Sequence, residues 1–420
     1  MNVVLISHSD TVGGAAVVSL RLIHALLGAG VTARMLVVDR RDIDVYAQPA
    51  GSMVRNKWNF LAERMGIFMN NGMNRGTLFK IDTCTHGLNF AKHEWVQEAD
   101  VVMLGWVNQG TLSLRGIQQI ADLGKPIVWV MHDMWNCTGV CHHAFDCEKY
   151  MSTCQSCPLT GKRGRDLSTK TQQRKARLYS EAAIHFVAVS HWLARVCRKS
   201  ALLRSQDIRV IPNTLKTEEY QFERLGDGYE GIPAHKKVVV VGARRLDEPG
   251  KGGAELVAAM QWVAEHKPAL ARQLHLVLYG DLRDRSLLGK IAIPVTYLGQ
   301  VSACRLNEVY RRADIVLSTS EFESFGATLI EGQASGCIPV ARGGDGRDDI
   351  IDHLRNGYLA RNGSAQSIAD GLEWAASQPV SREFLHSEVD GKFSYRIVAQ
   401  QFIELFNEIL SQRSSRLNTT

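Results

Sequence analysis

The chain has 420 residues, of which 45% are hydrophobic and 22% are charged, and its formal net charge is +6. This is the composition of an ordinary globular protein, and the length exceeds what one hydrophobic core usually serves, so we expect two domains of about 200 residues each. No apolar run reaches the roughly 18 residues of a membrane-spanning helix, and the N-terminus lacks the basic region of a signal peptide.

The first half of the chain alternates predicted strands and helices. The apolar patterns predict helices at residues 15–29 and 112–123, and strands at residues 3–6, 33–38, 101–104, 127–130 and 186–190. Residues 50–80 are basic, contain Asn and Gly, and are poorly patterned. Strands that alternate with helices indicate a doubly wound parallel sheet.

The second half restarts the same alternation after a break at Val210-Ile211-Pro212-Asn213. It predicts helices at 254–266, 303–311 and 396–411, and strands at 237–242, 274–279, 295–298 and 315–318. We therefore expect one domain over residues 1–212, a second over residues 213–395, and a terminal helix and tail over residues 396–420.

Two carboxylates, Glu323 and Glu331, lie eight positions apart around a Phe-Gly pair. A strand-type run precedes them, so Glu323 is expected at the carboxyl end of a strand, where open α/β sheets bind ligands. Gly326 is expected to open a helix whose free N–H groups and positive dipole end suit a diphosphate. Ser324, Ala327 and Glu331 would share one helical face toward that ligand. Solvated surface glutamates are the alternative.

Further candidate ligand-binding residues, basic side chains, a glycine and a histidine, follow other predicted strands. Arg244, Arg245 and Lys251 lie among glycines at a strand-to-helix turn, where backbone can approach a pyrophosphate closely. Gly14 follows the first strand, and His132 follows the strand at 127–130. Surface arginines, a plain turn and a structural histidine are the alternatives.

Five of the nine cysteines fall between residues 137 and 158. The C-x5-C-x6-C-x2-C spacing is compatible with a tetrahedral zinc site made of Cys141, Cys147, Cys154 and Cys157. Without a secretion signal, metal binding is favoured over disulfides, and reduced buried thiols are the alternative. Four thiolates leave no open position, so such a zinc would be structural and would pin a long loop beside His132.

The stretch from Ser320 to Val340 resembles the E-x7-E signature of the retaining glycosyltransferases of family 4. It departs mildly, with Gly332-Gln333 where Ala and a variable residue are common. The loop with Lys251 is similar to the family's G-R-L-x(3–4)-K-G motif, although Ala243 leaves the register open between Arg244 and Arg245.

The cysteine-rich region resembles a subset of that family from bacterial exopolysaccharide, colanic-acid-like and O-antigen clusters. The shared pattern runs H-D-x-W-x-x-T-G-x-C, then C and C-x-x-C-P. Gly105-Trp106-Val107-Asn108 also resembles the subset, but Gly105 replaces its usual histidine, so any role of that histidine is in doubt here.

The resemblance implies the α/β GT-B fold, in which two doubly wound Rossmann-like domains face a central cleft and the C-terminal helix crosses back to the N-terminal domain. It implies a glycosyltransferase of hexosyltransferase type, with an acceptor-side N-terminal domain and a C-terminal domain that binds a nucleotide sugar. The sugar would pass from a nucleotide-diphosphate donor to a saccharide hydroxyl with retention at the anomeric carbon.

The same resemblance assigns roles to residues, and none of them needs a catalytic metal. His132 would lie near the sugar's C6 hydroxyl, Glu323 would hold the sugar's hydroxyls, and Glu331 would fix the ribose. Arg245 and Lys251 would stabilise the departing diphosphate. The remaining donor contacts would come from Gly14, Arg244, Ser324, Phe325 and Gly326. The leaving phosphate could take the acceptor's proton on the same face, or a brief covalent intermediate could form; the sequence leaves both open.

The subset's acceptors are commonly lipid-linked, which implies a cytoplasmic enzyme of bacterial surface polysaccharide biosynthesis with peripheral contact to the inner membrane surface. The basic segment Gly161–Arg177 is a candidate for that contact, and a solvated helix face is its alternative. No pattern indicates nucleic-acid binding. The competing functions are a nucleotide-sugar epimerase of the same fold and a non-catalytic sugar-nucleotide-binding or assembly protein.

Overall fold

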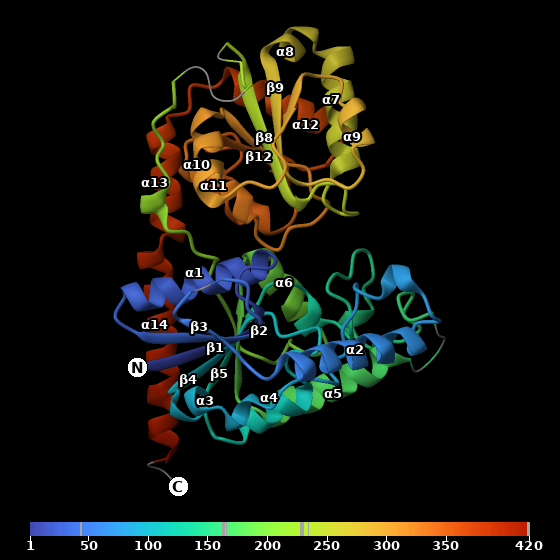
Figure 1. The fold of residues 1–420 in the computed structure, drawn as a ribbon, viewed down its shortest axis with the longest axis vertical. Coiled ribbons are helices and arrows are strands. Elements are labelled where there is room, and N and C mark those ends of the chain that lie inside the picture. The colour runs from blue at the N-terminus through green and yellow to red at the C-terminus, as the bar shows by residue number, and fades with distance from the viewer. Residues whose placement is uncertain (43, 162–163, 165, 227–230, 234, 418–420) are drawn as a thin grey trace. The chain divides into compact units, whose positions relative to one another are not determined.

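The computed structural model describes residues 1–42, 44–161, 164, 166–226, 231–233 and 235–417. The chain forms two compact units (Figure 1). Unit 1 contains residues 1–214 and 395–420, and unit 2 contains residues 215–394. The boundaries expected from the sequence were after residue 212 and after residue 395.

Unit 1 is built on one parallel sheet of seven strands in the order β3-β2-β1-β4-β5-β6-β7. Every neighbouring pair is parallel. The strands are β1 (Asn2–Ser9), β2 (Thr32–Asp39), β3 (Ala47–Pro49), β4 (Val101–Leu104), β5 (Ile127–Met131), β6 (Ile184–Ala188) and β7 (Ile208–Val210). The central strands β4 and β5 are buried along their whole length, which is why they are continuously apolar.

The helices of unit 1 connect these strands and cover the sheet. They are α1 (Gly14–Gly28), α2 (Met53–Asn70), α3 (Glu94–Glu98), α4 (Leu114–Ala121), α5 (Leu167–Glu181), α6 (His191–Lys199) and α14 (Tyr395–Leu417). The last of these, α14, packs against α1 (Figure 1), and it buries Val398, Phe402 and Phe406. The C-terminal helix therefore belongs to the N-terminal unit, as the resemblance implied.

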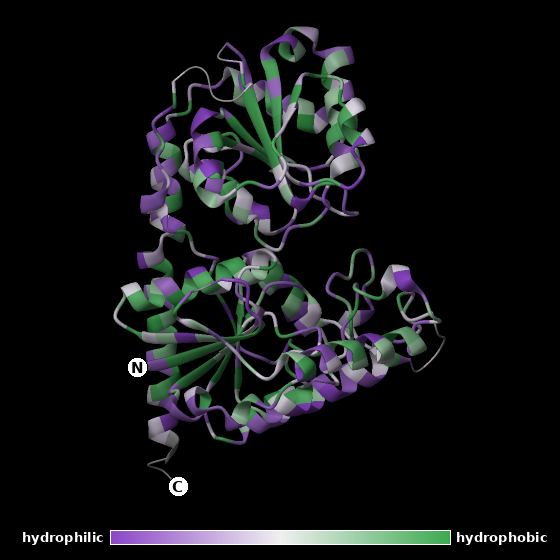
Figure 2. Ribbon diagram, in the orientation of Figure 1, coloured by the Kyte–Doolittle hydropathy of each residue, from purple (hydrophilic) through white to green (hydrophobic). Residues whose placement is uncertain are grey.

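Unit 2 repeats the architecture with six parallel strands in the order β10-β9-β8-β11-β12-β13. The strands are β8 (Lys237–Arg245), β9 (Leu274–Asp281), β10 (Val295–Tyr297), β11 (Ile315–Ser318), β12 (Ile338–Arg342) and β13 (Tyr358–Ala360). The helices are α7 (Gly253–His266), α8 (Pro268–Gln273), α9 (Ser286–Gly289), α10 (Ala303–Arg312), α11 (Ala327–Ala334), α12 (Ala365–Ser377) and α13 (Arg382–Phe393). Figure 2 shows that the central strands of both sheets are mostly hydrophobic.

The predicted α/β class with two doubly wound parallel sheets is confirmed. Several helices were not predicted. Among them, residues 50–80, which the sequence left without a pattern, contain α2. Its N-terminus is capped by Ser52, whose side chain accepts a hydrogen bond from the Arg55 backbone N–H. Within the described residues, no helix combines the length and the apolar character needed to cross a membrane.

Candidate functional site in unit 2

The loops after β8 and β11 form the centre of the site. These strands are parallel neighbours, so their carboxyl ends meet at one edge of the sheet. The Nζ atom of Lys251 donates a hydrogen bond to Oε1 of Glu323 over 3.0 Å. Glu321 also donates its backbone N–H to the Gly250 carbonyl over 2.9 Å. The structure thus brings together two residues that lie 72 positions apart and that the sequence assigned to one site.

Glycines permit the close approach of the two loops. Gly252 has a φ of +79°, and a Cβ atom there would lie 2.1 Å from the carbonyl oxygen of Thr319. Any other residue would have to move one loop away from the other. Gly326 has a φ of +113° and directly precedes α11, just as Gly252 precedes α7. Helix α11 therefore begins immediately after the motif loop that carries Glu323.

The Glu323 carboxylate is ionised in this setting. Burial alone would raise the pKa of Glu323, but the charges of Lys251 and Arg347 outweigh it and hold the pKa below its usual value. A carboxylate in this state accepts hydrogen bonds from hydroxyl groups and has no proton to donate. The arrangement therefore suits the binding of a polyhydroxylated group and not general acid catalysis by Glu323.

A third loop, after β12, holds the motif loop, and the sequence analysis missed it. Arg347 is only 1% exposed and pairs with Asp345, with Nη2 2.6 Å from Oδ2. Arg347 Nη1 also donates to the Ser320 carbonyl over 2.8 Å, while Asp345 Oδ2 accepts from the Glu323 N–H over 2.9 Å. The available signal was the run Gly343-Gly344-Asp345-Gly346-Arg347, which directly follows strand β12; that strand was not predicted either.

The other predicted donor-binding residues of the motif, Glu331, Phe325 and Ser324, lie in three different settings. Glu331 lies on α11 and is 8% exposed, and together with burial its charge raises the pKa of Tyr279. Phe325 is 3% exposed, and its ring packs edge-to-face on Phe393 with centroids 5.4 Å apart. Ser324 precedes the helix, because α11 begins at Ala327. The expectation that Ser324 shares a helical face with Glu331 is therefore wrong.

Arg244 and Arg245 end strand β8 instead of lying in the turn that follows it. Arg244 is exposed. Arg245 is half-buried, and its guanidinium lies 3.6 Å from Asp247 and 4.0 Å from Glu248. Arg245 thus already has carboxylate neighbours within its own loop, and a diphosphate would compete with them.

Candidate functional site in unit 1

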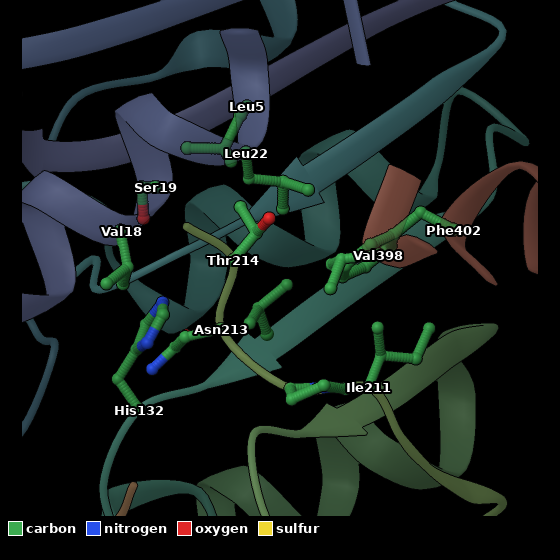
Figure 3. A pocket seen from close by; sticks show the side chains of 12 residues that line it. Leu5, Val18, Ser19, Leu22, His132, Ile211, Asn213, Thr214, Val398 and Phe402 are labelled. Atoms are coloured by element: carbon green, nitrogen blue, oxygen red, sulfur yellow. The ribbon is translucent and has the colours of Figure 1, made fainter. Parts of the chain in front are cut away.

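The two donor-binding or catalytic residues predicted in unit 1, Gly14 and His132, follow strands β1 and β5 in the chain. Gly14 is the first residue of α1, and a Cβ atom there would meet nothing within 4 Å. His132 follows β5 and lines a small cavity together with Ser19 and Asn213, as Figure 3 shows. Within the described residues, His132 Nε2 has no hydrogen-bond partner. Burial lowers the pKa of His132 to about 4 against the opposing charge of Asp133, so the imidazole is neutral at neutral pH.

A partly buried network next to His132 was not predicted. Asp133 Oδ2 accepts from Trp106 Nε1 over 3.0 Å and lies 2.8 Å from His142 Nδ1. His142 Nε2 lies 3.2 Å from Oδ2 of Asp82, and Asp82 also pairs with Arg64. Burial would lower the pKa of His142, but Asp133 and Asp82 outweigh it and raise the pKa to about 9. An imidazolium between two carboxylates therefore fixes the loop that follows β5.

The four cysteines of the predicted zinc site, Cys141, Cys147, Cys154 and Cys157, line one cavity with free thiols. Burial raises the pKa of Cys141 to about 12 and that of Cys154 to about 11, so both are protonated thiols at neutral pH. Among the described residues, no group of three or more His, Cys, Asp or Glu side chains has an arrangement that could hold a metal ion. The four thiols thus line one cavity, and zinc binding by them stays a prediction.

Comparison with known proteins

Residues 230–388, most of unit 2, match the model of the family Glycosyl transferases group 1. Among curated relatives, a phosphatidyl-myo-inositol mannosyltransferase of Mycobacterium leprae is 28% identical over 255 residues, which is 60% of this chain and 66% of that protein. The chain spans about half the length of two other curated relatives. The similarity to these relatives is thus partial.

Solved structures match over almost the whole chain. Sucrose-phosphate synthase of Thermosynechococcus elongatus superposes with a TM-score of 0.65 at 17% identity, covering 98% of this chain and 100% of that chain. Anabaena HepE, in complex with UDP and glucose, gives a TM-score of 0.60 at 16% identity, with 97% and 100% covered. The chain has the GT-B fold, and its second unit carries a glycosyltransferase group 1 domain.

Proposed function

We propose that the protein is a retaining glycosyltransferase that moves a sugar from a nucleotide-diphosphate donor to a saccharide acceptor, a lipid-linked one in bacterial surface polysaccharide biosynthesis. The observation that carries the proposal is the Lys251–Glu323 pair at the carboxyl edge of unit 2. It lies inside the segment that matches the glycosyltransferase family.

The chemistry of the pair supports this assignment. A cation beside the N-terminal region of α11 suits a departing diphosphate, because the free helix N–H groups and the dipole favour negative charge. The ionised Glu323 accepts hydrogen bonds from sugar hydroxyls. The name of the M. leprae relative supports a lipid-borne acceptor.

A donor panel tests the proposal. The purified full chain is incubated with UDP-, GDP- and dTDP-sugars, with and without lipid-linked saccharides, and the release of nucleoside diphosphate is measured. We expect slow release of nucleoside diphosphate with one donor alone and faster release when the acceptor is present. NMR spectra of the product should show that the new glycosidic bond keeps the anomeric configuration of the donor. The matched variant Glu323→Gln should no longer release nucleoside diphosphate.

Two other outcomes would replace the proposal. Conversion of the donor into its epimer without loss of diphosphate would indicate a nucleotide-sugar epimerase. Donor binding measured by calorimetry, with no turnover on any acceptor, would indicate a sugar-nucleotide-binding or assembly protein.

A further inference from the structure

Helix α2 of unit 1 has its polar and apolar sides reversed. Among the described residues, eight of the thirteen large hydrophobic side chains that are exposed lie between residues 53 and 79. On the helix they are Met53, Val54, Trp58, Leu61, Met65 and Met69, each 58% to 79% exposed. Positions 54, 58, 61, 65 and 69 follow the spacing of a single helical face, so this face is an apolar stripe.

The inner side of α2 is held by polar contacts instead. Glu63 is fully buried, and its carboxylate accepts hydrogen bonds from the backbone N–H groups of Thr83 and Thr85 over 2.9 and 3.0 Å. Arg64 donates to the Leu78 carbonyl over 2.6 Å and pairs with Asp82. These bonds dock the helix, so the exposed stripe is not needed to attach α2 to its unit.

The stripe continues past the end of the helix. Met73 and Phe79 are 62% and 57% exposed, and the Phe79 ring stacks on Phe60 of α2 with centroids 6.4 Å apart. Such a gathering of exposed apolar side chains is unusual for a monomeric surface and marks an interaction site.

The exposed charges within residues 53–80, the segment that carries the stripe, are of one sign. Arg55, Lys57, Arg75 and Lys80 are exposed, and in the described part of the chain none of them forms an ion pair with a carboxylate. The only acidic residue between positions 53 and 80 is Glu63, which is buried. An apolar stripe with Trp and Met, on a segment whose exposed charged residues are all cations, is complementary to the headgroup region of an anionic bilayer.

We propose that α2 and its continuation to Lys80 form a membrane-docking surface that lies in the interface of an anionic phospholipid bilayer. Trp58, Leu61 and Met65 enter the acyl boundary, while Arg55 and Lys57 contact the headgroup phosphates. The basic segment at residues 161–177 is a weaker candidate, because Lys175 is fully buried and Arg177 pairs with Glu181 over 2.8 Å. Positions 162, 163 and 165 lie outside the described residues.

Vesicle flotation with the full chain tests this surface without any enzymatic readout. The vesicles contain phosphatidylcholine alone or phosphatidylcholine and phosphatidylglycerol at about 3:1. We expect wild type to float with the anionic vesicles and to be released by salt. The double variant Trp58→Glu/Met65→Glu should bind at least about tenfold more weakly, because it places charge in the acyl boundary. Arg55→Glu/Lys57→Glu should abolish the preference for phosphatidylglycerol.

Matched controls separate the surface from general effects. Leu354→Glu changes a leucine of unit 2 that is 54% exposed, and it should float like wild type. Thermal melts should be unchanged for all variants, because the altered side chains are exposed. The proposal is overturned if wild type does not bind anionic vesicles at low salt, or if Trp58→Glu/Met65→Glu binds them equally. A dimer in light scattering that the same variant dissolves, without vesicle binding, would assign the stripe to a second copy of the chain.

Discussion

Lys251 and Glu323 illustrate how two residues set each other's chemistry. The lysine keeps the carboxylate ionised, and the carboxylate holds the ammonium group at the edge of the sheet next to the start of α11. The lysine side chain is 37% exposed, so an incoming diphosphate can reach it without disrupting the core. The pair is thus organised before any donor binds, which is the condition for electrostatic stabilisation of a leaving group.

Replacing the lysine separates this role from donor affinity. In Lys251→Ala we expect kcat to fall by roughly 10²- to 10³-fold, because a cation on the developing diphosphate charge acts mainly in the transition state. Donor affinity should change less. Steady-state kinetics with saturating donor measure both quantities. Lys290→Ala, an exposed lysine of the same unit, should behave like wild type. Normal turnover in Lys251→Ala would remove this lysine from the chemistry.

His142 predicts a pH dependence of the stability of unit 1. Its pKa is raised to about 9 in the folded state, so its contribution is fully present below its unfolded pKa of about 6.5 and is lost as the pH rises through 9. Relative to His142→Gln, wild type should lose up to about 3 kcal/mol of unfolding free energy between pH 6.5 and 9.

Urea unfolding of unit 1 at several pH values measures this difference. The comparison with His142→Gln cancels the slopes of other groups, including Lys175, whose pKa burial lowers to about 8. His235→Gln, an exposed histidine of unit 2, should leave the slope unchanged. A pH-independent difference between wild type and His142→Gln would mean that the imidazole is not charged between Asp82 and Asp133.

At the scale of elements, the loop after β12 determines the shape of the loop after β11. Arg347 joins Asp345 to the carbonyl of Ser320, and a Cβ atom on Gly346 would lie 2.1 Å from the Ser324 carbonyl oxygen. The motif that carries the carboxylate therefore rests on a second loop, whose contribution is positional.

Removing Arg347 should damage both stability and turnover. Arg347→Met leaves the buried Asp345 without its partner, at a cost of about 3 to 5 kcal/mol. Asp345→Asn/Arg347→Met should recover part of the melting temperature of unit 2, but not kcat, because the Ser320 carbonyl is still released. Arg355→Met breaks an exposed pair with Glu388 and should cost at most about 1 kcal/mol. Equal kcat for wild type and the double variant would contradict the positioning role.

The loop that contains Cys141, Cys147, Cys154 and Cys157 is predicted to bind a structural zinc ion, and metal analysis tests this prediction. Zinc coordinates thiolates, and burial now holds protons on Cys141 and Cys154, so zinc binding requires both to deprotonate and zinc would be released as the pH falls. Zinc content near one equivalent, absent in Cys154→Ser and removed by a chelator with loss of thermal stability, would support the structural ion. Metal-free protein whose thermal stability a chelator leaves unchanged would end that prediction.

The sequence predicted elements well where one pattern dominates. The strand at 315–318 and the helices at 254–266 and 303–311 agree with the structure to within one residue, because buried strands and sheet-covering helices leave strong apolar periodicities. Helix α2 was missed because apolar residues lie on its outer side and the buried side holds Asn59, Glu63 and Arg64. The spacing of Val54, Trp58, Leu61 and Met65 was nevertheless helical.

The candidate site was predicted unevenly for a similar reason. Glu323 and Lys251 each belong to a compact motif that follows one of two neighbouring strands, so their proximity follows from strand order. Arg347 and His142 act through partners that are distant in sequence, such as Ser320 and Asp82, and their contacts depend on loop conformations that no local pattern encodes. Phe325 belongs to the motif but packs against Phe393, a contact that local spacing does not reveal.

At the scale of the whole molecule, the two units are not consecutive in the chain, because unit 1 contains both the beginning and the end of it. Helix α14 ends the chain but belongs to unit 1, where Phe402 is 1% exposed and lines the cavity of His132. A mutation near the C-terminus should therefore act on the N-terminal unit. Two consecutive domains would predict the opposite.

Hydrogen exchange of Phe402→Ala distinguishes these expectations. The truncation removes a buried ring and should cost unit 1 about 3 to 5 kcal/mol. Amide protection should fall in α1, which packs on α14, and stay unchanged in α12 of unit 2. Leu372→Ala, at a fully buried position on α12, should show the reverse pattern. Protection lost in α12 but kept in α1 after Phe402→Ala would mean that α14 stabilises unit 2 and not unit 1.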